Sequence, residues 1–491
     1  MTTMGKPLLG ASSTSSWETI HWSTIEEDVR RLQMRIAKAA REKRWGKVKA
    51  LQWLLTHSRS AKLLAVRRVG RNAGRYTAGV DGVIWKSGNQ KVQAARSLKR
   101  RGYQPKPLRR VYIAKRNGKL RPLGIPTMVD RAQQALYLLA LEPVSETQAD
   151  PNAYGFRPKR SAADAIEQCF NALAQKHFAR WILEGDIKSC FDRISHSWLV
   201  DHVPMDKDVL KKWLAAGYME QGVVYPTEAG TPQGGIASPV LANLALNGLE
   251  AVAQNAAPKN QMIHVVKYAD DFIVTGASKE VLEEKVKPAV VAFLKERGLE
   301  LSHEKTRITH IDDGFDFLGF NVRTYNGTLL IKPAKAAVKR FLGDVRETIK
   351  AQAAAKTETL IWQLNRKIRG WTNYYRHVVA KKTLYYIDAQ IFGSLKTWIK
   401  RRHPNKPAHW WRKRYFRTQG GNHWVFFANS RDGLGKPRPL DLFKAASVPI
   451  TRHIKIRSDA TPYDPVYTDY FRHRAQAHRR RRLERGQRTS G

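Results

Sequence analysis

The segment His264-Val265-Val266-Lys267-Tyr268-Ala269-Asp270-Asp271-Phe272-Ile273-Val274 places two adjacent aspartates between two apolar runs. Short apolar runs joined by a tight turn predict two strands, with Asp270 and Asp271 held at the turn. Acidic pairs are common in ordinary β-turns, where they only solvate a surface or accept backbone hydrogen bonds. Here the apolar flanks enclose the carboxylates, which costs stability unless a cation compensates them. The segment therefore predicts a metal-binding turn.

A third carboxylate lies upstream, at the end of another expected strand. Trp181-Ile182-Leu183-Glu184-Gly185-Asp186 has the apolar pattern of a buried strand and ends on Asp186, where the chain turns. Carboxylates suit Mg²⁺, which keeps waters and also binds phosphate oxygens. Asp186 is therefore predicted to join the acidic pair in one magnesium site. Glu184 and Asp192 are expected to pair with nearby arginines or backbone groups.

The pattern around these motifs changes once along the chain. From 109 to about 320, short apolar runs bounded by Gly, Asp and Pro alternate with helical periods, which predicts an α+β domain. From about Lys335 helical stripes predict a separate helical domain. Basic amphipathic helices are expected after a Ser/Thr-rich start, and a small module at 420–454 and a basic tail at 479–482 come last.

The composition points to a polyanionic partner. The 491 residues hold 87 Lys and Arg against 42 Asp and Glu, a formal charge of +45, and nucleic acid is the commonest partner for such a surface. The length predicts two or three domains, and a hydrophobic content of 42% predicts that the chain folds. No apolar run predicts a membrane span and no signal pattern opens the chain, so we expect a cytosolic protein. Cys169 and Cys190 cannot form a disulfide framework or a four-cysteine zinc site.

Three motifs in a fixed order carry a resemblance to a known family. They are Asp186-Ile187-Lys188-Ser189-Cys190-Phe191-Asp192, Gly230-Thr231-Pro232-Gln233-Gly234-Gly235 and Tyr268-Ala269-Asp270-Asp271. Together they resemble the bacterial group II intron-encoded reverse transcriptases, over nearly the whole chain. The resemblance implies a right-hand polymerase. The implied domains are an N-terminal extension with basic helices (1–90), fingers and palm (91–330), a helical thumb or maturase domain (331–418) and a DNA-binding region with a basic tail (419–491).

The resemblance also implies an RNA-directed DNA polymerase that uses two Mg²⁺ ions, with Mn²⁺ as a possible substitute. Phe191 occupies the position of a steric gate, where a bulky ring excludes a ribose 2′-hydroxyl. Lys305 matches a proposed proton donor to pyrophosphate, and a simple phosphate contact is an equal alternative. Phe315–Phe320 resembles the primer grip, although its pattern also suits a core strand. The implied metal-binding positions are Asp186, Ile187, Asp270 and Asp271, and the implied catalytic residues are Asp186, Asp270, Asp271 and Lys305.

Nucleotide binding is implied at a basic hairpin and at the middle motif. The hairpin carries Lys115 and Arg121, whose charge-assisted hydrogen bonds suit a triphosphate. Without the three motifs above, a solvated turn would be the better interpretation of this hairpin. Tyr154–Pro158 is followed by Ser161 as an expected helix N-cap. This stretch matches a segment that the family carries before the first of the three motifs, Asp186–Asp192. The implied nucleotide-binding residues are Arg109, Lys115, Arg121, Phe191, Gln233 and Gly234.

The helical region distinguishes an intron protein from other reverse transcriptases. Residues 364–376 resemble the maturase domain, where cations neutralise phosphates and aromatic rings stack on exposed RNA bases. Trp371 is expected in the core of this domain and Arg376 on its RNA-facing side. The implied RNA-binding residues are Arg366, Lys367, Arg369, Arg376, Arg401, Arg402, Arg412 and Lys413.

The resemblance names the partners and leaves alternatives. Group II intron RNA, an RNA template with a DNA primer, target DNA and deoxynucleotides are implied, in the bacterial cytosol or nucleoid. Residues 453–464 resemble the segment before an HNH endonuclease, whose paired cysteines do not follow, so we expect the primer for intron mobility to come from elsewhere. The alternatives are a retron- or defence-type polymerase without a splicing role, and an RNA-folding maturase without polymerase activity, against which the intact aspartates argue.

Overall fold

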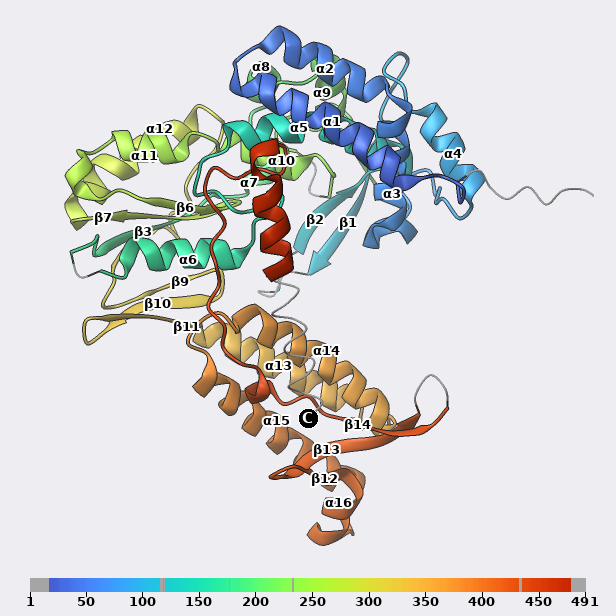
Figure 1. The fold of residues 1–491 in the computed structure, drawn as a ribbon, viewed down its shortest axis with the longest axis vertical. Coiled ribbons are helices and arrows are strands. Elements are labelled where there is room, and N and C mark those ends of the chain that lie inside the picture. Colours follow the sequence, from blue (N-terminus) through green and yellow to red (C-terminus); the bar gives the residue numbers. More distant parts are fainter. Residues whose placement is uncertain are drawn as a thin grey trace, which may run out of the picture.

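The computed structural model describes residues 17–114, 118, 120–175, 177–231, 234–431 and 435–477. The N-terminal helices pack against the long helix α5, which is buried along most of its length (Figure 1). Leu136 and Leu139 of α5 belong to the same core as Val29 and Leu55, so this extension is part of the larger body. The elements are α1 (Trp22–Arg41), α2 (Trp45–His57), α3 (Arg59–Arg71), η1 (Ala73–Tyr76), α4 (Gly88–Ser97) and α5 (Met128–Gln148).

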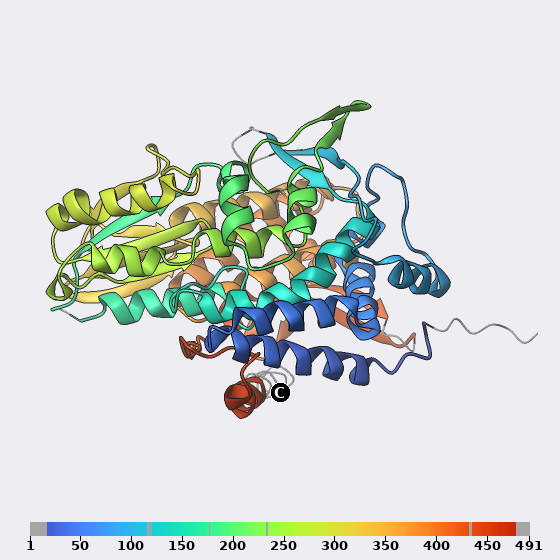
Figure 2. The ribbon, with the colours of Figure 1, turned by 90° about the horizontal axis from the view of Figure 1, so that it is seen from above.

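A sheet in the order β2-β1-β4-β5 stands beside these helices. Strands β1 and β2 are antiparallel with Ile113 opposite Arg121, as the expected hairpin requires, and β1 runs parallel to β4. Figure 2 shows this sheet apart from the sheet that carries the aspartates. Its strands are β1 (Leu108–Ala114), β2 (Leu120–Ile125), β4 (Tyr218–Glu220) and β5 (Val223–Tyr225).

The aspartates lie on a second sheet, in the order β6-β7-β3-β8. Its side chains alternate between two apolar layers: Leu183 and Val274 face one core, whereas Ile182 and Ile273 face the core that α6 completes. The apolar cores on the two faces exclude water from the sheet. The elements are β3 (Trp181–Asp186), α6 (Ala162–Leu173), α7 (Cys190–Arg193), α8 (His196–His202), α9 (Lys207–Leu214), α10 (Ser238–Ala245), α11 (Leu249–Asn255), η2 (Lys259–Gln261), β6 (Val265–Tyr268), β7 (Asp271–Gly276), η3 (Val281–Val286), α12 (Lys287–Lys295) and β8 (Arg307–His310).

The helical region is continuous with the body. A small sheet, β11-β10-β9, packs under the central sheet, and its Phe320 lies in one core with Phe341 and Leu364 of the helices. The expected separate helical domain therefore shares its core with the α+β part. Strand β11 also crosses the expected boundary at residue 330. The elements are β9 (Phe315–Phe317), β10 (Phe320–Tyr325), β11 (Thr328–Pro333), α13 (Lys335–Ala351), α14 (Thr357–Tyr375) and α15 (Lys381–Arg402).

The expected small module is an antiparallel sheet in the order β12-β13-β14. It begins at Phe416, earlier than expected, because β12 pairs with β13. Asn365 of α14 donates to the carbonyl of Asp441 at 2.8 Å, which fixes the module to the helices. The elements are α16 (Ala408–Tyr415), β12 (Phe416–Gln419), β13 (Asn422–Arg431), β14 (Pro437–Asp441) and η4 (Ala445–Ser447).

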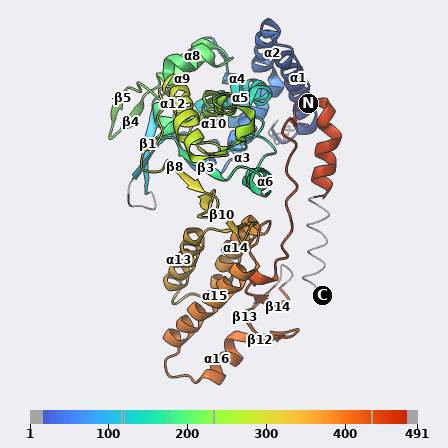
Figure 3. The same ribbon diagram turned by 90° about the vertical axis from the view of Figure 1, so that its left-hand side faces the viewer.

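Residues 449–477, here called the C-terminal strap, return along the molecule from this module to the N-terminal helices (Figure 3). The strap includes η5 (Pro465–Tyr467). Asp164 of α6 is its main anchor: this side chain is 1% exposed and accepts hydrogen bonds from the backbone N–H of Ile456 at 2.8 Å and from Arg474 at 2.9 Å. The strap thus bridges the helical region and the body.

Candidate active site

The three aspartates of the two strand motifs meet at one end of the central sheet. β3 and β7 are antiparallel and in a register that places Asp186 opposite Asp271. Tyr268 and Asp271 form the last pair of the β6–β7 hairpin, so Ala269 and Asp270 make its turn. Ala269 has a φ of 58°, a conformation that a non-glycine residue adopts only where its surroundings enforce it. The predicted turn is therefore present, and it holds two of the three carboxylates.

The segment 150–157 enforces the conformation of this turn. Ala153 forms a bridge with Lys267, and the N–H of Tyr154 donates to the Lys267 carbonyl at 2.8 Å. Gly155 lies so close to the turn that a Cβ there would be 2.3 Å from the nitrogen of Ala269. Only glycine permits this approach, because the neighbouring atoms belong to the backbone.

Electrostatics at the turn favour a bound cation. Burial raises the pKa of Asp270, and Asp186 raises it further, while Arg121 and Lys305 lower it. Burial, Asp270 and Asp186 together raise the pKa of Asp271 to about 6, although solvent still reaches the outer side of this residue. A raised pKa means that burial and neighbouring carboxylates destabilise the charged form of these groups, and a bound cation would offset that cost.

Lys305 supplies a positive charge to the site in this structure. Its Nζ lies 2.9 Å from both carboxylate oxygens of Asp186. In the part of the chain that the structure describes, no three His, Cys, Asp or Glu side chains are grouped closely enough to hold a metal ion. The Lys305 side chain is 65% exposed, so it can leave Asp186 without disturbing the core. The oxygen donors of the aspartates are of the kind that Mg²⁺ prefers.

Ile187 can contribute only a backbone oxygen. Its side chain is 2% exposed and packs in the core. The N–H of Ser302 donates to the Asp186 carbonyl and the N–H of Lys188 to the Glu300 carbonyl, which form the bridge between Ile187 and Leu301. Because antiparallel pairing alternates, the Ile187 carbonyl points away from Leu301, toward the side of β3 on which β7 lies. It is available on the side of the aspartate hairpin.

Phe191 is positioned by its neighbours on three sides. Its carbonyl accepts a hydrogen bond from the N–H of Thr231 at 2.6 Å, and Gly230 packs against the same peptide. The ring of Phe156 meets the Phe191 ring edge-on, with centroids 6.2 Å apart. The middle motif therefore holds the loop after β3. Gly234, at a φ of 117°, lies against the Gly124 carbonyl of β2 and joins this loop to the outer sheet.

The basic hairpin sends one of its predicted residues toward the aspartates. Arg121 is exposed and close enough to Asp270 to lower the pKa of that carboxyl group. Arg109 lies further along β1 and donates to the Ala78 carbonyl at 3.0 Å, which ties it to the N-terminal layer. The predicted nucleotide-binding residues Lys115 and Gln233 lie outside the described residues.

Two buried ion pairs beside the site were missed by sequence reasoning. Lys267, one residue before the turn, is 2% exposed and donates to Asp150 at 2.8 Å. Arg157 binds Glu146 through two hydrogen bonds of 2.9 and 3.0 Å. Both pairs fix the 150–157 segment that presses on the turn. The available signal was a lysine inside the otherwise apolar run of β6, which requires a buried acid.

Glu184 is a structural partner, as expected. It accepts hydrogen bonds from Arg307 at 2.8 and 3.0 Å and from Thr309 at 3.0 Å, both on β8. These contacts hold β8 against β3. Glu184 therefore lies outside the metal-binding set.

The predicted RNA-binding residues spread over the helical region. Arg376 differs from the others: it is half-buried and donates to the Thr451 hydroxyl of the strap at 3.3 Å. Trp371 stacks on Phe341 at 5.0 Å, in the core position expected for it. Seven of these residues are exposed: Arg366, Lys367, Arg369, Arg401, Arg402, Arg412 and Lys413.

The primer-grip segment touches the helical region directly. The hydroxyl of Tyr374 donates to the Leu318 carbonyl at 2.8 Å, and that of Tyr375 donates to the Gly319 carbonyl at 3.1 Å. The end of α14 is thus fixed to the turn between β9 and β10. Movement of the helices relative to the body would move this turn as well.

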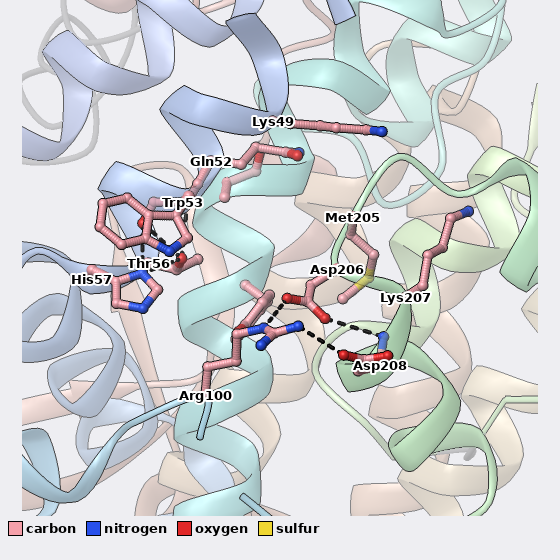
Figure 4. A pocket seen from close by; sticks show the side chains of 12 residues that line it. Lys49, Gln52, Trp53, Thr56, His57, Arg100, Met205, Asp206, Lys207 and Asp208 are labelled. Atoms are coloured by element: carbon pink, nitrogen blue, oxygen red, sulfur yellow. Dashed lines mark hydrogen bonds and ion pairs between the residues drawn. The ribbon is translucent and has the colours of Figure 1, made fainter. Parts of the chain in front are cut away.

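A cavity of about 340 Å³ lies away from the aspartates, between α2 and the start of α9 (Figure 4). Trp53 and His57 stack at one side, with centroids 4.3 Å apart. Arg100 reaches across to Asp206 and Asp208 and closes the opposite side. Of the described residues that line it, none is a predicted catalytic or nucleotide-binding residue.

None of the helices in the described ranges is long and apolar enough to cross a membrane.

Comparison with known proteins identifies the family. Residues 113–322 match the family model of the reverse transcriptase (RNA-dependent DNA polymerase), residues 17–98 that of the N-terminal domain of reverse transcriptase, and residues 338–416 that of the group II intron maturase-specific domain. Protein YkfC of Escherichia coli (strain K12) is 32% identical, over 61% of this chain and 88% of that protein. The group II intron-encoded protein LtrA of Lactococcus lactis subsp. cremoris is 29% identical, over 64% of this chain and 68% of LtrA.

A solved telomerase structure from Candida albicans covers 62% of this chain and 63% of its own, with a TM-score of 0.35 and 12% identity. The family models carry the assignment: a reverse transcriptase domain lies on the aspartate hairpin, and a maturase-specific domain lies on the helices beyond it. This chain belongs to the group II intron-encoded reverse transcriptases and maturases.

Proposed function

We propose that this RNA-directed DNA polymerase uses Asp186, Asp270 and Asp271 as its catalytic carboxylates, and that it supports mobility of its intron by target-primed DNA synthesis. One observation carries the proposal. The register of β3 and β7 pairs Asp186 with Asp271, and the turn adds Asp270, so that three carboxylates from two distant motifs share one end of the sheet.

The residues of the turn have distinct roles in this proposal. Two Mg²⁺ ions, for which Mn²⁺ is a possible substitute, would activate the attacking 3′ oxygen and stabilise the leaving pyrophosphate. The three carboxylates and the Ile187 carbonyl would hold these ions. Lys305 neutralises Asp186 until then. Released from Asp186, its ammonium group can bind the leaving phosphate or donate a proton to it.

Selection of deoxynucleotides rests on Phe191. Its ring lies just after Asp186 and is braced by Phe156, and its peptide is fixed by Thr231. A braced ring excludes a 2′-hydroxyl more strictly than a mobile one, because it cannot rotate away. Arg121 binds the triphosphate from the hairpin side, and its charge already acts on Asp270. Gly234 supports the nucleotide, and Arg109, Lys115 and Gln233 complete the predicted pocket.

The domains follow the right-hand plan. We assign an N-terminal extension to residues 1–90, fingers and palm to 91–330, the thumb to 331–418 and a DNA-binding region to 419–491. The exposed cations of the helical region bind the intron RNA in this assignment. The partners are that RNA, an RNA template with a DNA primer, target DNA and deoxynucleotides, in the bacterial cytosol or nucleoid.

The alternatives are less well supported. A retron- or defence-type polymerase has no need of a maturase-specific domain, which residues 338–416 match. A maturase without polymerase activity has no need of three aspartates in register. Both activities are therefore expected in one protein.

The two activities can be separated by mutation. Asp270→Ala should abolish Mg²⁺-dependent extension of a DNA primer on an RNA template and leave protein-assisted splicing intact. The matched control is Asp313→Ala, an exposed aspartate beyond β8, which should change neither activity. The double variant Arg366→Ala/Lys367→Ala should weaken splicing and leave primer extension unchanged. Primer extension that persists in Asp270→Ala would rule out the assigned carboxylates.

A further inference from the structure

A cavity of about 900 Å³ lies between the helices α14 and α15 and the β13–β14 hairpin. We call it the aromatic groove and define it by Arg369, Tyr385, Phe392, Lys396, Trp424 and Phe443. Figure 3 shows these elements side by side, below the central sheet in that view. Asn365 of α14 fixes the module to the helices, because it bonds both Asp441 and Phe443 of the module. The groove exists only where the helices and the module meet.

Aromatic rings line the groove and remain open to solvent. Tyr385 is 56% exposed and Trp424 is 42% exposed. Trp424 is held in place by Phe392, whose ring meets it edge-on at 5.8 Å, and by Phe416 at 5.4 Å. A ring that is fixed yet exposed, as Trp424 is, loses little conformational entropy when a planar ligand stacks on it.

Cations stand at the rim of the same groove. The Arg369 guanidinium lies 4.3 Å from the centre of the Phe443 ring, and Lys396 Nζ lies 5.8 Å from that of Phe392. Lys444 is exposed beside them. The two lining carboxylates already have partners: Asp388 accepts the N–H groups of Ala445 and Ala446, and Asp441 binds Arg417. Arg369, Lys396 and Lys444 outnumber these two carboxylates, so the net charge presented to a ligand is positive.

This chemistry selects one kind of occupant. An apolar protein segment would satisfy the rings but leave the cations desolvated without partners, which is costly. A duplex would satisfy the cations, but its bases are already stacked on one another. A single strand offers both a free base for the rings and phosphates for the rim. We propose that the aromatic groove binds an unstacked nucleobase of a single-stranded segment, with its flanking phosphates on Arg369, Lys396 and Lys444.

The proposal deepens the proposed function, since it rests on a nucleic acid being the partner of the helical region, but it does not depend on polymerase activity. It predicts a contact with the base as well as with the backbone. It also predicts that the module and the helices bind the strand together. Single-stranded RNA and single-stranded DNA share this chemistry, and the experiment below compares them.

The test is equilibrium binding of labelled oligonucleotides to the full chain. Trp424→Ala and Tyr385→Ala should each weaken binding of a single-stranded RNA about tenfold, the size of one base–aromatic stack. The same RNA with an abasic site at each position should bind wild type and variants alike. A duplex of equal length should also bind them alike. The control is Tyr386→Ala, which removes a neighbouring ring that is 52% exposed but does not line the groove.

Two results would overturn the proposal: equal losses for the abasic and the intact strand, or a loss in Tyr386→Ala as large as in Trp424→Ala. The corresponding DNA strand shows whether the groove prefers RNA, and either preference supports it. Primer extension on a pre-annealed template should persist in all three variants and reports that they fold. Absence of primer extension in the wild type would refute the polymerase assignment and leave the binding result to stand by itself.

Discussion

The substitution Gly155→Ala tests how the aspartate turn is held. The new Cβ would lie 2.3 Å from the nitrogen of Ala269 and 2.8 Å from the carbonyl carbon of Tyr268. Ordinary contact between such atoms requires the two segments to part by roughly 1 Å. No side-chain rotation can relieve the overlap, because the atoms in the way are backbone. The turn that carries Asp270 must therefore move.

The expected effect on catalysis is large. Displacing a catalytic group by about 1 Å costs roughly 100-fold in rate. Overpacking of this kind costs about 1–3 kcal/mol of stability, which leaves a protein of this size folded. The assay is single-turnover extension of a DNA primer on an RNA template at saturating Mg²⁺ and deoxynucleotide. Intron RNA binding by the same sample measures the folded fraction.

The matched control is Gly343→Ala. This glycine lies inside α13, and a Cβ there would have no atom within 4 Å. Alanine is the better helix former by up to about 1 kcal/mol, so the control should keep its rate and gain stability. If Gly155→Ala extends primers at the wild-type rate, the idea that this glycine sets the turn is wrong. A loss that merely follows the folded fraction refutes it as well.

Four further outcomes follow from the site and the strap. The pKa of Asp271 is raised to about 6, so protons compete with Mg²⁺ for this carboxylate in acid. The Mg²⁺ concentration that primer extension requires should therefore rise about tenfold per pH unit below that value. A requirement that does not change with pH would contradict this. In the metal-free protein the same shift adds stability in acid that is lost as the pH rises through 6, so Asp271→Asn should flatten that part of a pH–stability curve. Asp164→Ala should lower the free energy of unfolding by about 3–5 kcal/mol, since Arg474 loses a buried partner, and an unchanged urea midpoint would count against the anchor. Phe191→Ala should admit ribonucleotides, and competition between matched ribo- and deoxynucleotides measures this; unchanged discrimination would reject the gate.

The aspartate hairpin was predictable because its evidence is local. Two apolar runs, a two-residue turn and acids at a fixed place all lie within one short segment. The same holds for β3, which ends on Asp186 as expected. The pairing of β3 with β7 joins segments far apart in the sequence. Only the order of the motifs, through the family resemblance, indicated that their aspartates belong to one site.

Helix ends were less predictable, as α5 illustrates. The apolar spacing from Asp130 to Leu141 is typical of a helix, and Pro143 is a residue at which a helix would ordinarily end. The helix continues through Pro143 to Gln148. Helices and the central body cover α5 on all sides, and this packing outweighs the local cost of proline.

Buried ion pairs and the strap were not predictable from local patterns. Lys267 and Asp150 are 117 residues apart in sequence, and no spacing rule connects them. Arg376 illustrates the same limit. The resemblance of its segment to the maturase domain implied an RNA contact, whereas the Arg376 side chain donates a hydrogen bond to Thr451 of the strap. The role of Arg376 in RNA binding stays a prediction. The roles of Lys115 and Gln233 in nucleotide binding also stay predictions.

The strap has a consequence for how the protein is made. Asp164 is synthesised 289 residues before His453, with which it also bonds. At roughly 5–20 residues per second, the ribosome takes about 15–60 s to deliver that partner. Throughout this interval the carboxylate of α6 stays hydrated and the layer beneath it stays open. The contact between the strap and α6 therefore forms only in the last part of translation. A chain truncated before the strap would leave this surface of α6 exposed to proteases.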